Sequence, residues 1–435
     1  MINFFRENSS VYIDDLEKLC TLHNLNFKEF LESFIIKKII DLNEKEKTII
    51  FRYVGLIIQK DLVIFVFPKY YKNLELKERS LEYAHLLLKV FDKYSTNNKL
   101  YNYELKSFNM NEEYLSFNIY GLYKFFINDY VENGIYFDYE RKYEINGAGN
   151  IDWTKTINKN SMIISNGVPI YTELYTLSNS VNEDNIIRKI HIHILKKVSD
   201  FFEKLDLFKL DVDFEEDNEI NSNEYEYLSN VLINKLNIEY IDRNKTLIRA
   251  MKLFMDKEVL DSRDNENNFF GTREFEYVWQ KVCEEVVGND FGKLIKELDN
   301  PVIFSYDHNI PNNIRGKLLP DIIRYVEDKN VMYVLDAKYY DFDFDASGKI
   351  KGGIPRTYDV IKQFAYESKL REKYKPNTVF NAFLIPNMNK TEKKGYIEYT
   401  LFSYNNKIEV IFIDTEELYR KYLQNETIEI EMIFD

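Results

Sequence analysis

Residues 318–340, LLPDIIRYVEDKNVMYVLDAKYY, constrain the fold more than any other part of the chain. Two apolar runs rich in β-branched residues flank the polar turn 327–330, and this pattern predicts a β-hairpin. If the loop is the two residues 328–329, residues whose numbers sum to 657 face each other across the ladder. Asp321 and Asp336 form such a pair, and facing Cβ atoms lie about 4.5–5.5 Å apart.

Two carboxylates at this spacing destabilise a sheet unless a positive charge lies between them. Oxygen ligands alone suit Mg²⁺, or alternatively Mn²⁺. Alternation along the strand places Lys338 on the same face as Asp336, where an ammonium group can orient a nucleophile or stabilise charge on a phosphate. The apolar neighbours of Asp336 predict a buried strand, whereas the alternative is a surface ion pair on a solvated hairpin.

The sequence PD at 320–321, followed by DAK at 336–338, resembles the PD-(D/E)xK nuclease motif. This resemblance implies that Asp321 and Asp336 bind the metal and that Lys338 is the catalytic lysine. A predicted helix downstream carries Gln363 and Tyr366, which are similar to the Gln–Tyr motif of some branches of that superfamily. They would position DNA or the attacking water, although the same spacing also fits an ordinary amphipathic helix.

An acidic residue on the first helix of the nuclease region is also implied by the resemblance. Glu276 matches it best and would be a further metal ligand, directly or through water, with Glu274 as the rival assignment. A solvated helix flank is the plainer interpretation of Glu276.

Four further short segments carry a second resemblance: FRYVG, FPKYY, GAGNIDWTKTI and FGT, starting at residues 51, 67, 147 and 270. Together they resemble the LlaJI-type restriction endonucleases, relatives of McrC, the nuclease subunit of modification-dependent restriction systems. In that family the nuclease works with a McrB-like AAA+ GTPase that recognises DNA and translocates. The resemblance therefore implies double-stranded DNA as substrate and such a GTPase as partner, contacted by the N-terminal part of this chain. The chain has no G-x-x-x-x-G-K-[ST] sequence, so a motor must be a separate chain.

The length of 435 residues exceeds the usual size of a domain with a single hydrophobic core. We expect a mixed α/β (α+β) fold of several domains, with a central mixed sheet flanked by helices in the nuclease. The predicted regions are an N-terminal β-containing partner-binding region, a mixed α/β middle region and a C-terminal PD-(D/E)xK nuclease domain, at residues 1–110, 111–260 and 265–435.

Local patterns add three expectations. Residues 48–58 and 62–71 predict a β-hairpin, and the polar residues 261–268 predict a linker. The longest apolar run, 62–68, is far shorter than the roughly 20 residues of a membrane helix. With no signal-peptide pattern at the start, we expect a cytoplasmic protein without membrane contact.

The net charge of −14 argues against a simple nucleic-acid coat. Residues 310–394 nevertheless contain 16 lysines and arginines against 11 aspartates and glutamates, a net charge of +5 that leaves −19 elsewhere. This favours DNA at the nuclease region. The expected function is a Mg²⁺-dependent DNA endonuclease subunit of a restriction (anti-phage defence) system. The alternatives are a non-catalytic activator of the GTPase and a self-sufficient, sequence-specific restriction endonuclease.

Overall fold

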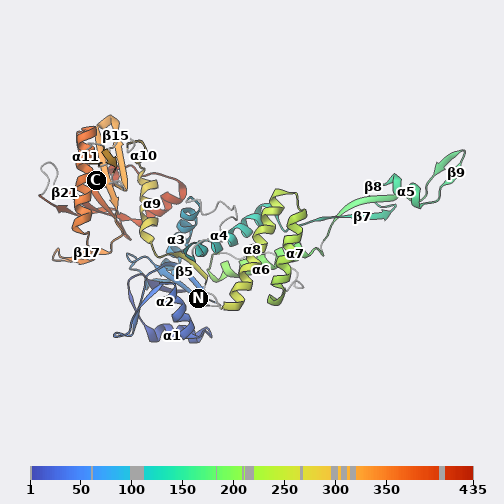
Figure 1. The fold of residues 1–435 in the computed structure, drawn as a ribbon, viewed down its shortest axis with the longest axis horizontal. Coiled ribbons are helices and arrows are strands. Elements are labelled where there is room, and N and C mark those ends of the chain that lie inside the picture. The colour runs from blue at the N-terminus through green and yellow to red at the C-terminus, as the bar shows by residue number, and fades with distance from the viewer. Residues whose placement is uncertain are drawn as a thin grey trace. The chain divides into compact units, whose positions relative to one another are not determined.

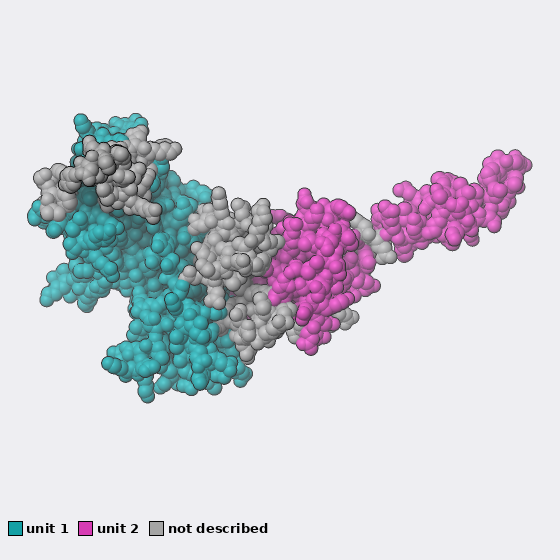
Figure 2. Space-filling view, viewed as in Figure 1, with its two compact units in different colours: residues 1–120, 268–435 teal, residues 121–267 magenta. Residues whose placement is uncertain are grey.

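The computed structural model describes residues 2–59, 62–97, 112–182, 184–207, 210, 220–264, 268–294, 302–304, 311–313, 320–400 and 407–434. The fold is mixed α+β, as predicted, and it divides into two compact units (Figures 1 and 2). Unit 1 combines Met1–Tyr120 with Asn268–Asp435, and unit 2 is Gly121–Asn267. The predicted division into residues 1–110, 111–260 and 265–435, with a role for each region, stays a prediction. In the described part of the chain, no helix is long and apolar enough to cross a membrane.

The N-terminal part of unit 1 is built on a four-stranded sheet. Strand β1 is parallel to β6, while β5 is antiparallel to both β6 and β12. The sheet order is β1 (Ile2–Arg6), β6 (Leu62–Phe67), β5 (Val54–Gln59) and β12 (Asn268–Thr272). Beside it lie a small sheet and two helices, which share one apolar core with it. They are β2 (Ser10–Tyr12), β4 (Thr48–Phe51), β3 (Ile40–Asn43), α1 (Ile13–Leu22) and α2 (Phe27–Ile36).

The hairpin predicted from residues 48–58 and 62–71 exists as β5 and β6, but its first strand is shorter than expected. The chain leaves the sheet at Arg52, whose backbone N–H donates to the Ile39 carbonyl and whose side chain bonds Asp41 at 2.6 Å. Residues before it form β4, which belongs to the small sheet. The prediction of one continuous strand over 48–58 was therefore wrong.

Two segments that carry the family resemblance pair with each other in this sheet. Gly55 of β5 faces Gly271 of β12. A Cβ atom on Gly271 would overlap the Val54 carbonyl oxygen, and Gly55 has a φ of +137°, which side-chain-bearing residues rarely adopt. These glycines let β12, more than two hundred residues away along the chain, approach β5 closely.

The predicted linker at 261–268 is wrong at both of its ends. Helix α8 (Asp242–Asp264) continues into it, and Asn268 already begins β12. The boundary between the two compact units nevertheless falls at Asn267–Asn268, inside the predicted stretch. Residues 265–267 lie outside the described residues.

The C-terminal part of unit 1 holds a five-stranded mixed sheet. Its inner strands β16, β19 and β21 are parallel, and β15 and β20 pair antiparallel at the two edges. The order is β15 (Ile322–Val326), β16 (Val331–Ala337), β19 (Thr378–Asn387), β21 (Lys407–Asp414) and β20 (Glu392–Glu398). Shorter strands are β13 (Val302–Phe304), β14 (Pro311–Asn313), β17 (Phe342–Phe344) and β18 (Ile350–Gly352).

Helices cover both faces of this sheet (Figure 1). Helix α11 (Thr357–Tyr374) packs Tyr366 and Leu370 against Met332 and Val334 of β16. The opposite face carries Tyr333, which contacts Phe434 of α13 (Glu431–Phe434). The remaining helices here are α9 (Phe275–Val287), α10 (Phe291–Leu294) and α12 (Thr415–Gln424).

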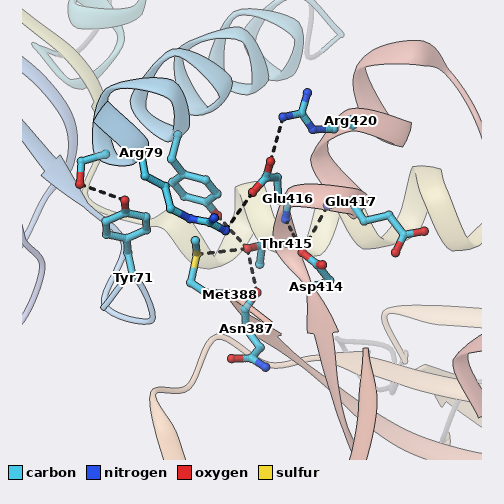
Figure 3. Close-up of polar contacts among 11 residues, drawn as sticks. Tyr71, Arg79, Asn387, Met388, Asp414, Thr415, Glu416, Glu417 and Arg420 are labelled. Carbon is cyan, nitrogen blue, oxygen red and sulfur yellow. Dashed lines mark hydrogen bonds and ion pairs between the residues drawn. The ribbon is translucent and has the colours of Figure 1, made fainter. Parts of the chain in front are cut away.

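A buried hydroxyl network joins the N-terminal and C-terminal parts of unit 1. Helix α3 (Lys77–Asn97) brings the Tyr83 hydroxyl to 2.7 Å from Thr415 Oγ1, which also donates to the Asn387 carbonyl (Figure 3). Nearby, Arg79 lies 3.6 Å from Glu416. Because Tyr83 and Thr415 are buried, each hydrogen bond that they lost would leave a polar atom unsatisfied.

Unit 2 contains packed helices and a small antiparallel sheet. Helix α6 (Ile186–Lys204) buries a stripe at helical spacing, including Ile187, Ile190, Ile194 and Val198. The other elements are α4 (Glu112–Asn133), which begins in unit 1, α7 (Tyr225–Ile238), α8 and η1 (Ser222–Glu224). The sheet and the short elements between its strands, residues 139–181, are called the arm below. They are β7 (Tyr139–Ile145), β8 (Asn150–Ile151), α5 (Trp153–Lys159), β9 (Ile163–Ser165), β10 (Val168–Ile170) and β11 (Tyr175–Val181).

Candidate active site

The hairpin β15–β16 has the register that the sequence predicts. Ile322 pairs with Leu335, so Asp321 stands opposite Asp336 at the next position. The turn is a 3-10 turn, η3 (Glu327–Lys329), closed by Asn330 in the left-handed conformation. Asp336 is 7% exposed, which agrees with the predicted buried strand and not with a solvated hairpin.

Asp321 is fixed by two donors. Gln280 Nε2 donates to one carboxylate oxygen at 3.0 Å, and the backbone N–H of Ala337 donates to the other at 2.9 Å. Burial and the neighbouring Asp336 carboxylate raise the pKa of Asp321 to about 9. Without a cation, Asp321 is therefore protonated at neutral pH, because two charges cannot share this site.

Lys338, which directly follows the last residue of β16, completes the group. Its Nζ lies 2.9 Å from Asp336 Oδ2 and 3.2 Å from Asp359 Oδ1. Burial acts to lower the pKa of Lys338, but the Asp336 and Asp359 carboxylates outweigh it and the pKa is raised. Lys338 is therefore a permanent cation at this site.

Helix α11 places both predicted motif residues against β16. Gln363 is fully buried and donates from Nε2 to the Val334 carbonyl at 2.9 Å. Tyr366 is buried beside Val334, and burial, followed by the charges of Asp336 and Asp321, raises its pKa to about 12. Both residues thus contact Val334, two residues before Asp336 on β16.

The structure does not bring the predicted helix acid to this group. Glu276 and Glu274 are both exposed at the start of α9. Burial raises the pKa of Glu7, and the charge of Glu276 adds to that increase, so Glu276 lies near Glu7. The metal-binding role of Glu276 stays a prediction.

Two residues at the site were missed in the sequence. Gln280, one helical turn after Glu276, is the α9 residue that contacts Asp321, and it also bonds Glu284 at 3.4 Å. The i, i+4 spacing from Glu276 could have indicated Gln280. Asp359 had a weaker signal, an acidic residue in the first turn of the predicted helix.

The donor set fits a hard divalent cation. Asp321 and Asp336 supply carboxylate oxygens, and their mutual repulsion would be relieved by positive charge. Among the described residues, no three histidine, cysteine, aspartate or glutamate side chains gather as a metal-binding cluster. The remaining ligands of an ion here would have to be water, backbone or substrate oxygens.

Comparison with known proteins places the chain in a family. It is 31% identical over 393 residues to the type II restriction enzyme BsuMI component YdjA of Bacillus subtilis (strain 168), across 89% of this chain and 83% of that protein. Among solved structures it is similar to a half-complex of Thermococcus gammatolerans McrB AAA+ hexamers with bound McrC, at 13% identity and a TM-score of 0.35, over 98% of this chain and 100% of that one. Another, the McrBC complex of the same organism, matches at 11% identity and a TM-score of 0.23, over 59% and 80%.

Residues 53–416 match the LlaJI restriction endonuclease family, a span that includes the carboxylate pair, Lys338 and α11. That match covers most of the chain, and the Bacillus subtilis relative is a restriction enzyme component. This chain belongs to the LlaJI restriction endonuclease family.

Proposed function

We propose that the chain is the nuclease subunit of a restriction system and that it hydrolyses phosphodiester bonds of double-stranded DNA at the Asp321–Asp336 pair. The observation that carries the proposal is the Lys338 ammonium, 2.9 Å from Asp336, beside two facing carboxylates on a buried hairpin. Family membership supports the restriction role, and the PD-(D/E)xK resemblance supports the type of reaction.

Asp321 and Asp336 would hold Mg²⁺, with Mn²⁺ as the alternative ion. When bound, the ion supplies positive charge that stabilises the attacked phosphate and makes water more acidic. Asp321 would lose its proton on binding, because a metal ligand has to be deprotonated. Gln280 and the Ala337 N–H hold that carboxylate in one orientation, so little reorganisation is required.

Lys338 acts as a cation and hydrogen-bond donor rather than as a base. A lysine whose pKa is raised cannot accept a proton near neutral pH. Its ammonium would stabilise negative charge on the phosphate or on the nucleophile. Gln363, tied to the Val334 carbonyl, fixes the strand two residues before Asp336, which favours a positioning role for it.

We also propose that the partner is a McrB-like AAA+ GTPase and that the arm takes part in the contact. The arm exposes apolar side chains, each between 38% and 67% accessible, within a few dozen residues. Clusters of this kind usually mark protein interaction surfaces. It also holds the GAGNIDWTKTI segment that carries the family resemblance. The exposed residues are Tyr143, Ile145, Ile151, Trp153, Ile157, Met162, Ile163, Ile164, Val168 and Ile170.

Plasmid cleavage by the purified chain with Mg²⁺, with and without the neighbouring AAA+ protein and GTP, tests the proposal. Cleavage that requires the partner and disappears in Asp336→Asn and Lys338→Ala is expected. Cleavage by the chain alone would favour the self-sufficient enzyme. GTP hydrolysis stimulated without any cleavage would favour the activator.

A matched control comes from the same part of the fold. Asp328→Asn changes an exposed carboxylate in the turn of the same hairpin. This variant should cut at the normal rate. Retained cleavage by Asp336→Asn would refute the site.

A further inference from the structure

Lys338 lies between two carboxylates. Its Nζ is 2.9 Å from Asp336 and 3.2 Å from Asp359, and these three side chains are 20%, 9% and 19% exposed. A lysine side chain is long and flexible, so one contact leaves it considerable freedom. The orientation of the ammonium therefore depends on both carboxylates.

The two carboxylates are not equivalent. Asp336 stands opposite Asp321 at the proposed cation site, so a bound divalent ion would neutralise it and would also repel the Lys338 ammonium. Asp359 belongs to α11 and not to the hairpin, and its Oδ1 lies 3.2 Å from the same ammonium. The negative charge of Asp359 can therefore still attract Lys338 when a bound cation neutralises Asp336.

Asp359 is itself held in place. Its Oδ2 accepts hydrogen bonds from the Tyr340 hydroxyl at 3.1 Å and from the Arg356 backbone N–H at 3.2 Å. Burial acts to raise the pKa of Asp359, but Lys338 and these donors lower it overall, so the carboxylate stays charged. A helix cap needs only Oδ2, whereas Oδ1 is directed to Lys338. The contacts thus exceed what a cap requires.

We propose that Asp359 is a positioning residue for the reaction: it holds the Lys338 ammonium in place when Asp336 is engaged with a cation. This inference rests on the proposed function, because it gives Asp359 a role only through Lys338. Tyr340 and the first turn of α11 would serve to orient Asp359 toward the lysine.

Two substitutions separate charge from shape. Asp359→Asn keeps an oxygen for the helix cap but loses the charge, and Asp359→Glu keeps the charge at a helix position that favours glutamate. In the full complex with plasmid, Mg²⁺, the AAA+ protein and GTP, Asp359→Asn should cut roughly tenfold more slowly at unchanged DNA affinity. Asp359→Glu should recover part of the rate, and Asp328→Asn should match the unsubstituted chain. An unaffected rate in Asp359→Asn, or a Glu variant as slow as the Asn variant, would overturn the inference.

Mn²⁺ binding to the full chain, followed by electron paramagnetic resonance, needs no cleavage. Asp336→Asn should lose binding, while Asp359→Asn should bind Mn²⁺ like the unsubstituted chain. Loss of binding in Asp359→Asn would make it a ligand and overturn the positioning role. If Lys338→Ala cuts normally, the proposed function itself fails; if Lys338→Ala is inactive and Asp359→Asn cuts at full rate, only this inference fails.

Discussion

Replacing Asp321 by asparagine should stabilise the metal-free protein while abolishing its cleavage of DNA. Asp321 and Asp336 face each other on a buried hairpin, and burial together with Asp336 raises the pKa of Asp321 from 3.8 to about 9. The folded chain therefore binds a proton that the unfolded chain lacks over this pH range. The free energy of unfolding then falls as pH rises, by at most about 1.4 kcal/mol per pH unit.

The size of the effect follows from the pair. Between about pH 5 and about pH 8 the folded chain keeps Asp321 protonated while the unfolded chain ionises it, so the free energy of unfolding of the unsubstituted chain falls by up to about 4 kcal/mol. Asparagine has one oxygen where Asp321 accepts from both Gln280 and Ala337, so one hydrogen bond is lost, at about 1 kcal/mol. We expect Asp321→Asn to be about equal in stability near pH 5, and up to about 4 kcal/mol more stable near pH 8.

Urea unfolding with a chelator, at about pH 5 and about pH 8, measures this difference. Tryptophan fluorescence reports on unit 1, because Trp279 is fully buried there whereas Trp153 is 54% exposed in the arm. Added Mg²⁺ should stabilise the unsubstituted chain and leave the variant unchanged, and Asp328→Asn should behave like the unsubstituted chain throughout. A variant less stable at the higher pH, or a difference that does not change with pH, would refute the repulsion argument.

Three further predictions concern other parts of the molecule. Burial lowers the pKa of His191 from 6.5 to about 4, so unit 2 should lose up to about 3 kcal/mol of stability as pH falls through this range. His191→Asn should remove this dependence, and an unfolding temperature that changes with pH equally in the variant and in the unsubstituted chain would contradict the prediction. Tyr339→Phe leaves the buried Glu7 carboxylate without its hydroxyl donor and should cost about 1–3 kcal/mol in chemical unfolding, unless Glu7→Gln is present as well. Trp153→Asp in the arm should weaken co-purification with the AAA+ protein without changing the unfolding temperature, and normal co-purification would exclude this residue from the contact.

The carboxylate pair could be predicted because it depends on local rules. Alternation and pairing within one hairpin fix the register, and the paired apolar runs leave few alternatives, so Asp321 and Asp336 meet as expected. The loop itself was longer than predicted, with residues 327–330 between the last paired residues, but a symmetric change in loop length preserves the register.

Residues that depend on distant parts of the chain were harder to place. Whether Glu276 or Gln280 lies beside the carboxylate pair depends on the position of α9 along the sheet. The packing of the buried Trp279 and Val282 sets that position, and no local sequence pattern predicts it. The same holds for β12, which looks like the end of a linker until Gly55 and Gly271 are seen to face each other. Long-range packing therefore set the limit of the sequence analysis.

N-terminal and C-terminal segments of the chain pack together within unit 1, and this limits how the activator alternative can be tested. Removing residues 1–260 would leave β12 without its neighbour β5, and would expose Phe270, which is 3% accessible. It would also leave Tyr419 without its 2.6 Å hydroxyl contact to Tyr70. A truncated nuclease region would then fail in the GTPase assay because it is misfolded, whatever its true role. Lys338→Ala in the intact chain avoids this problem: if it still stimulates GTP hydrolysis but no longer cuts DNA, activation and cleavage are separate functions of one fold.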